Sequence, residues 1–286
     1  MDVKLHNVGE LIARCWTEAE EETSRAVNEK YWSPGKEDIT FIFAGELRSK
    51  VKRVSDRGAV EDAFIRDLED SIPFHRLDAD LVRLSRGLIA RVNFHNRAHE
   101  GRKSAADLGI AIRRPLVRFE SYGMQVETHP DHATGLLAQA KLGLRQQKVP
   151  ARKWGKLTDQ QVALFAKRRA YSSLLLYRLG GKEANELRHF RWQLCKDYTV
   201  RQVKKWLLSD SFPEEVDSSN VMQRLIAGSI GTEDKKIIQT IIDPSGTAPQ
   251  AIEVQVYWRP GEGPPPLFAL TGEQTQKERL IQTLRY

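Results

Sequence analysis

The sequence predicts an α/β protein in which a central mixed sheet is flanked by helices. Apolar residues recur with helical spacing through the N-terminal third, and short apolar runs with the length or alternation of strands follow. With 286 residues, of which 40% are hydrophobic and 29% charged, the chain can bury a sizeable core. We divide it into N-terminal helices (1–93), a core of strands with one helix (94–180) and a mostly helical C-terminal extension with a late strand (181–286).

Four helical segments are expected before the core. An amphipathic pattern over 5–31 ends at Ser33-Pro34-Gly35, and a second apolar stripe over 38–54 begins with acidic residues that the helix dipole favours. A third helix is expected over 59–71. The pattern over 77–92 fits either a further helix or a helix that leads into a strand.

The remaining elements are expected in an order that mixes strands and helices. The strand-like runs are 108–112, 136–141, 172–177 and 252–258. A helix is expected from Thr158, between the second and third of these runs, because Thr158 is a suitable N-cap. The segments 183–208 and 219–242 have helical patterns.

Two of the strand-like runs carry polar residues that a buried strand should lack. Asp107 precedes Leu108, and Gln139 and Lys141 end the second run. Residues two apart on a strand point the same way, so Gln139 and Lys141 would share one face, and Asp107 would join them if the two strands are neighbours. A carboxylate, a neutral carbonyl oxygen and a lysine in a small volume suit hydrolysis of phosphodiesters with a divalent metal.

These residues resemble the PD-(D/E)xK (restriction-endonuclease-like) nuclease superfamily, in the Asp...Gln-x-Lys variant of Mrr-like enzymes. A group of bacterial nuclease-like proteins reads Glu-x-x-Thr, then Glu...Gly-Ala-Asp, then Gln-Ala-Lys, then a helix with glutamine. The corresponding stretches here are Glu37-Asp38-Ile39-Thr40, Glu100 with Ala105-Ala106-Asp107, Gln139-Ala140-Lys141 and Gln160-Gln161. The resemblance covers roughly residues 36 to 180. Two features depart from it: Ala105 replaces the glycine, and the long Asp107–Gln139 interval implies an inserted loop around 129–132.

The resemblance implies a restriction-endonuclease-like sheet and a magnesium-dependent endonuclease that hydrolyses DNA in bacterial restriction or phage defence. Asp107 would bind Mg2+, for which Mn2+ would substitute, and Gln139 would supply its side-chain oxygen. Lys141 would orient the water or stabilise the developing charge. Glu37 or Glu100 would complete the site, with Glu46 as a rival. Because Gln139 replaces an acid, one bound metal is favoured over two.

The distribution of charge indicates an anionic partner. The net charge is +7, and residues 141–206 hold 17 Lys and Arg against 4 Asp and Glu, whereas residues 17–70 hold 9 against 14. We expect DNA, with RNA as the alternative, and a homodimer or a defence-system protein as a further partner. The nucleic-acid-binding candidates are Lys153, Lys156, Gln160, Lys167 and Arg168.

Other classes of protein and other kinds of site are less well supported. No apolar run approaches the roughly 18 residues of a membrane span, and the N-terminus lacks a signal-peptide core, so a cytoplasmic protein is expected. Cys15 and Cys195 form no metal-binding pair, and a zinc site at His95 and His99 lacks further ligands. Two alternatives to a nuclease stay open: a catalytically inactive nucleic-acid-binding protein of the same fold, and a helical interaction protein in which Gln-x-Lys is accidental.

Overall fold

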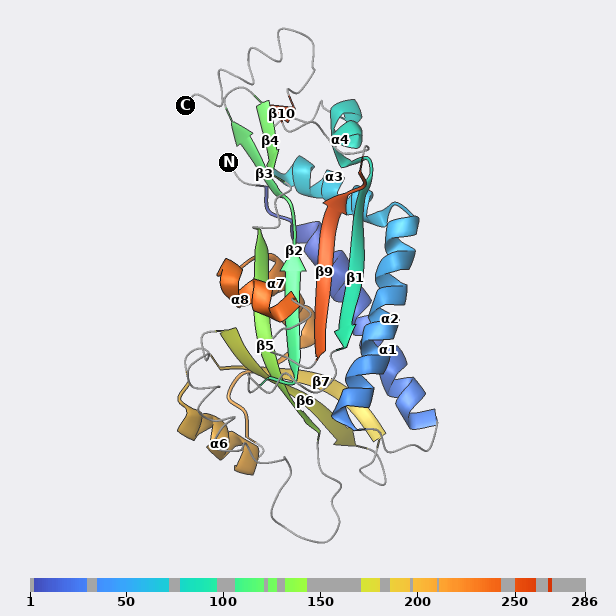
Figure 1. Ribbon diagram of the computed structural model, residues 1–286. Coiled ribbons are helices and arrows are strands. Elements are labelled where there is room, and N and C mark those ends of the chain that lie inside the picture. Colours follow the sequence, from blue (N-terminus) through green and yellow to red (C-terminus); the bar gives the residue numbers. More distant parts are fainter. Residues whose placement is uncertain are drawn as a thin grey trace.

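A seven-stranded mixed sheet, in the order β1-β9-β2-β5-β6-β7-β8, forms the centre of the computed structural model (Figure 1). The structure describes residues 3–29, 35–71, 78–96, 106–120, 123–127, 132–142, 171–180, 186–195, 198–209, 211–242, 250–260 and 267–268. The strands of this sheet are β1 (Leu88–Asn96), β2 (Leu108–Arg113), β5 (Ala133–Leu142), β6 (Ser172–Gly180), β7 (Glu186–Leu194), β8 (Glu215–Asp217) and β9 (Gln250–Trp258). A smaller sheet holds β3 (Leu116–Glu120), β4 (Gly123–Glu127) and β10 (Leu267–Phe268).

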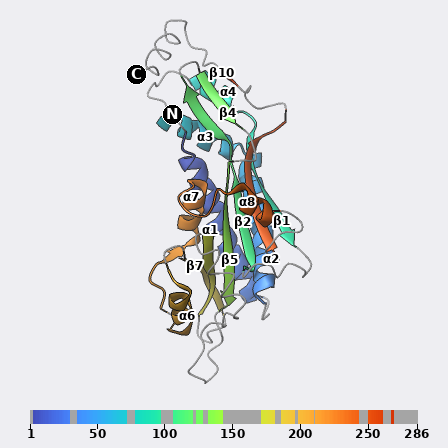
Figure 2. The ribbon, with the colours of Figure 1, turned by 60° about the vertical axis from the view of Figure 1, so that its left-hand side comes forward.

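Helices cover both faces of the main sheet, which confirms the predicted α/β class (Figures 1 and 2). The helices are α1 (His6–Glu29), α2 (Lys36–Asp56), α3 (Ala59–Ser71), α4 (Asp78–Ser85), α6 (Val200–Ser209), α7 (Ser218–Ile226) and α8 (Lys235–Ile242). The apolar stripes of α1 and α2 pack on alternate strand residues such as Ile110 and Val254. The intervening residues, such as Ala111, face α8. No described helix is long and apolar enough to cross a membrane.

The N-terminal expectations agree closely with the structure. The helices expected over 5–31, 38–54 and 59–71 are α1, α2 and α3. For 77–92, where two alternatives were open, the structure has the short helix α4 followed by β1. These segments are long and periodic, so local sequence is sufficient to define them.

The prediction of a helix over the whole of 183–208 is wrong. Residues 186–194 form β7, which pairs antiparallel with β6, and only Val200–Ser209 is helical. Phe190 and Trp192, two positions apart, are both buried, and the Phe190 ring contacts the rings of Phe43 and Tyr177. Pairing with β6 and this aromatic packing outweigh a local pattern that either type of element could satisfy.

The late strand lies inside the sheet, next to the edge strand β1. β9, expected over 252–258, lies between β1 and β2 and is antiparallel to the first and parallel to the second. The long interval between Asp107 and Gln139 contains the hairpin of β3 and β4, which belongs to the smaller sheet with β10. In the main sheet the strands therefore follow their chain order except for β9, which is inserted between β1 and β2.

A buried carboxyl group joins α1 to β7 and α7. The indole N–H of Trp16 donates to Glu20 Oε1 at 3.0 Å, the Ser218 hydroxyl donates to the same oxygen, and the indole N–H of Trp192 donates to Ser218 Oγ at 2.6 Å. Burial raises the pKa of Glu20 from its usual 4.5 to about 8. The folded protein therefore holds a proton on Glu20 over a pH range in which the unfolded chain releases it.

This proton predicts how stability depends on pH. Because the folded state binds more protons between pH 4.5 and about 8, the free energy of unfolding should fall as the pH rises through that range. Glu20→Gln removes the titration and keeps the polar contacts. We expect its melting temperature to exceed that of the wild type by roughly 5 °C or more at pH 8.5 and to match it near pH 4.5. Calorimetry at both pH values checks this, and an equal difference at both would contradict it.

Candidate active site

The antiparallel pairing of β2 with β5 brings Asp107 and Gln139 together. Leu108 pairs with Ala138, and the Asp107 backbone N–H donates to the Ala138 carbonyl at 2.9 Å. This register sets Asp107 opposite Gln139, and Gln139 Nε2 donates to Asp107 Oδ2. The two strands are thus neighbours, as the sequence analysis required for a joint site.

Lys141 is the second polar residue that β5 carries on this face. It is 7% exposed and Gln139 is 1% exposed, so both are enclosed among apolar neighbours. Burial lowers the pKa of the Lys141 ammonium to about 8; the positive charge of Lys36 lowers it further and Asp107 opposes the fall. Burial also raises the pKa of the Asp107 carboxyl, and the charges of Lys36 and Lys141 limit that rise.

The first turn of α2 adds two further charged residues to Asp107 and Lys141. Lys36 Nζ lies 2.7 Å from Asp107 Oδ2, and the negative charge of Glu37 raises the pKa of Asp107. The Glu37 backbone carbonyl accepts a hydrogen bond from Gln250 Nε2 at 3.2 Å, which ties this turn to the start of β9. The first turn of α2 therefore brings two opposite charges to Asp107: Lys36 lowers the pKa of its carboxyl group and Glu37 raises it.

A buried hydroxyl pair holds this turn of α2 against the sheet. Thr40 Oγ1 lies 2.6 Å from the Tyr177 hydroxyl of β6 and donates to the Lys36 carbonyl at 2.8 Å. Tyr177 is fully buried, and burial raises the pKa of its hydroxyl. The threonine of the Glu-x-x-Thr pattern thus has a positioning role that the pattern did not specify.

Lys36 is a residue that sequence reasoning missed. A lysine at the first position of a helix is disfavoured by the helix dipole, so its presence at the start of the second apolar stripe signals a compensating negative partner. Asp107 is that partner, 71 positions away in the chain. The sequence indicates that Lys36 stands at the start of a helix, but it does not indicate which residue is its partner.

The remaining predicted residues are placed as follows. Glu46 lies nine positions after Glu37, about 13 Å farther along α2, so Glu37 is the carboxylate that the helix brings to Asp107. His95 Nε2 lies 3.5 Å from the buried Glu253. Outside the described residues lie Glu100, His99, Thr158 with the helix expected there, Lys153, Lys156, Gln160, Lys167 and Arg168.

The polar groups at Asp107 fit a hard divalent cation. Within the described part of the chain, no three His, Cys, Asp or Glu side chains gather as a metal site. Gln139 Oε1, however, is buried without a hydrogen-bond partner, and rotation of the amide would turn this oxygen toward Asp107. Carboxylate and amide oxygens are ligands that Mg2+ accepts. Lys36 is bound to the same carboxylate, so it would compete with such a cation.

The electrostatic coupling of Lys141 can be tested with two opposed substitutions. Asp107→Asn removes a negative charge that favours the ammonium, so the pKa of Lys141 should fall below about 8. Lys36→Met removes a like charge, so the pKa should rise. Acetylation of Lys141 by acetic anhydride, followed by mass spectrometry over a pH series, reports both shifts. Parallel shifts in the two variants, or none, would contradict the coupling.

Comparison of the chain with protein-family models, with curated proteins and with solved structures found no match. A function for this protein must therefore be inferred from the geometry of the candidate site.

Proposed function

We propose that the protein is a metal-dependent nuclease that hydrolyses phosphodiester bonds of DNA, in a bacterial restriction or phage-defence role. The observation that carries the proposal is the contact between Asp107 and Gln139 across β2 and β5, with the low-pKa Lys141 on the same strand. Perturbed lysines and buried carboxylates that meet in one place are typical of catalytic sites. The proposed class of reaction is the one that the resemblance to PD-(D/E)xK nucleases implies.

Asp107, Gln139 and Glu37 would hold a divalent cation, Mg2+ or Mn2+. When bound, the cation would polarise a phosphoryl oxygen and offset the negative charge that develops during hydrolysis. Because burial raises the pKa of Asp107, binding of the cation should strengthen as the pH rises and the carboxyl loses its proton. This set offers two carboxylates and one neutral oxygen, which favours one cation over two.

The two lysines have distinct roles in this proposal. A substantial fraction of Lys141 is neutral near its pKa of about 8, so its Nζ atom can accept a proton from the attacking water. A bound cation would displace Lys36 from Asp107, and the ammonium group would then be able to contact a phosphate oxygen. Thr40 and Tyr177 keep the turn that carries Lys36 and Glu37 in place.

A cleavage assay on supercoiled plasmid tests the proposal. With Mg2+ or Mn2+ the wild type should nick the plasmid, EDTA should abolish the reaction, and Lys141→Ala should slow it by about 10²–10⁴-fold. Lys141→Arg keeps the positive charge but cannot release a proton, so it should be as slow as Lys141→Ala if the amine acts as a base. The exposed Lys236→Ala on α8 is the matched control and should cut at the wild-type rate.

A second candidate function is a nucleic-acid-binding protein without catalysis. It is favoured by the ion pair between Lys36 and Asp107, which neutralises the carboxylate without any metal. The absence of cleavage with either cation, together with salt-sensitive binding that persists in EDTA, would select this candidate over the nuclease.

A further inference from the structure

We propose that the groove between α2 and the edge strand β1 binds a single nucleic-acid strand that extends away from the candidate active site. We define this α2–β1 groove as the pocket lined by Arg48, Lys52, Arg91 and Arg259 together with the ring pair of Phe41 and Phe94, which lies toward the candidate active site. The inference rests on the nuclease proposed above for the direction of the strand, but its binding chemistry is independent of catalysis.

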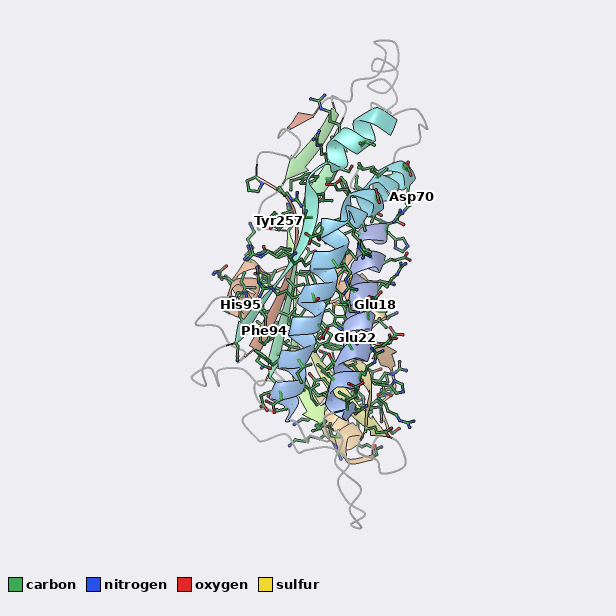
Figure 3. All side chains as sticks on the ribbon, turned by 90° about the vertical axis from the view of Figure 1, so that its right-hand side faces the viewer. Glu18, Glu22, Asp70, Phe94, His95 and Tyr257 are labelled. Carbon is green, nitrogen blue, oxygen red and sulfur yellow. The ribbon has the colours of Figure 1, made fainter. Side chains whose placement is uncertain are left out.

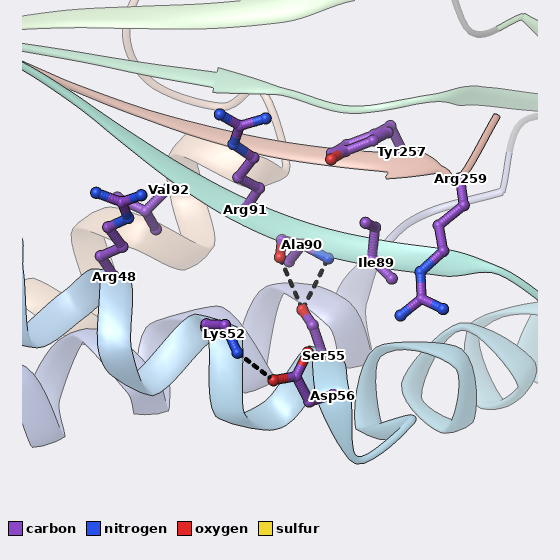
Figure 4. A pocket seen from close by; sticks show the side chains of 10 residues that line it. All are labelled: Arg48, Lys52, Ser55, Asp56, Ile89, Ala90, Arg91, Val92, Tyr257 and Arg259. Carbon is purple, nitrogen blue, oxygen red and sulfur yellow. Dashed lines mark hydrogen bonds and ion pairs between the residues drawn. The ribbon is translucent and has the colours of Figure 1, made fainter.

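The far end of the groove is a basic cavity of about 240 Å³ (Figure 4). Its walls carry Arg48 and Lys52 from α2, Arg91 from β1 and Arg259 after β9, whereas Asp56 is the one carboxylate among its lining residues. Asp56 Oδ2 lies 2.6 Å from Lys52 Nζ and so balances one of these charges. The lining residues therefore carry a net positive charge, and guanidinium groups such as those of Arg48 and Arg91 can each donate two hydrogen bonds to a phosphate group.

A stripe along α2 connects this cavity to the candidate active site. Glu37, Phe41, Arg48 and Lys52 follow one another at helical spacings of four, seven and four, which sets them on one face of α2. The stripe spans 15 positions, or about 22 Å, which is room for several nucleotides. At Gly45, between Phe41 and Arg48, a Cβ atom would find no other atom within 4 Å, so the path is open there.

An exposed aromatic ring lies between the site and the cations. Phe41 is 57% exposed, and Phe41 and Val82 are the two large apolar side chains that are exposed in the described part of the chain. The ring meets Phe94 of β1 edge-on, with centroids 5.8 Å apart. An exposed ring followed by guanidinium groups is the arrangement on which single-stranded nucleic acids stack their bases and track their phosphates.

At Ala90, the edge of β1 is already occupied by a side chain of α2, which disfavours a different kind of partner, an added peptide strand. The Ser55 hydroxyl donates to the Ala90 carbonyl at 2.7 Å and accepts from the Ala90 N–H at 3.0 Å (Figure 4). At Ala90, these bonds use the backbone groups that an incoming strand would need. The groups that a ligand can contact in the groove are therefore the positively charged side chains and the Phe41 ring rather than the backbone of β1 at Ala90.

Two acidic residues of α1 lie on the side of α2 that faces away from the groove. Figure 3 shows Glu18 and Glu22 on one side of α2 and Phe94, His95 and Tyr257 on the other. Both glutamates lie 3.6 Å from Lys50 Nζ. Folding thus keeps these carboxylates away from the groove, where they would repel phosphate.

The test measures binding of a fluorescently labelled oligothymidylate by anisotropy, in EDTA so that cleavage cannot interfere. The double variant Arg48→Ala/Arg91→Ala should bind at least tenfold more weakly at low salt. Its salt slope, log K against log [salt], should be shallower by about 1.4, because each lost phosphate contact on a single strand contributes about 0.7. Both arginines are exposed, so the melting temperature should not change.

Two further variants separate stacking from charge. Phe41→Ala should weaken binding about tenfold or more without changing the salt slope, whereas Phe41→Tyr keeps the ring and should bind like the wild type. Arg53→Ala is the matched control, because it removes the same charge from an exposed position of α2 outside the lining of the groove. Its affinity should stay near that of the wild type.

The outcomes distinguish this inference from the nuclease. If the double variant loses no more affinity than Arg53→Ala, the groove is not the binding site. If Phe41→Ala binds normally and polyglutamate competes as well as the oligonucleotide, the surface is a general anion site and the assignment to nucleic acid is overturned. If the wild type does not cut but the groove variants lose binding as expected, the nuclease proposal fails and the groove stands.

Discussion

The antiparallel register of β2 and β5 is the constraint on which the candidate site depends. Pairing of Leu108 with Ala138 sets Asp107 opposite Gln139 and sends Leu108, Ile110 and Ala138 into the core beneath α1 and α2. A shift of one residue would exchange the two faces of the strand, turn Asp107 into that core and turn Leu108 and Ile110 toward the face that α8 covers. The hydrophobic pattern of the strands therefore fixes the position of the polar groups.

The site is also an arrangement of compensated charges. Two lysines, Lys36 and Lys141, face the carboxylates Asp107 and Glu37 around an enclosed glutamine. In such surroundings each charge shifts the pKa values of its neighbours more than it would in water. In the proposed nuclease, a divalent cation would have to replace Lys36 at Asp107, so the two positive partners would exclude each other.

Helix α2 contributes to the candidate site, to the hydrophobic core and to the α2–β1 groove. Its first turn is held by Thr40 and Tyr177 at the candidate site, its buried stripe packs on the sheet, and its outer stripe forms one wall of the α2–β1 groove. Its side toward α1 carries Lys50, which forms ion pairs with Glu18 and Glu22. Counted along the sequence, residues 17–70 are net acidic, yet the groove that they help to form is basic.

The sequence by itself determined the long helices, the α/β class and the shared face of Gln139 and Lys141, because these follow from local periodicity. That Asp107 joins them depends on the pairing of β2 with β5, which the tertiary structure decided. Only the tertiary structure decided that β9 lies between β1 and β2, that 186–194 is a strand, and that Lys36 reaches Asp107. The tertiary structure also decided that Arg48 and Lys52 of α2 lie beside Arg91 of β1. Each of these depends on contacts between residues far apart in the chain, for which a local pattern carries no information about the partner.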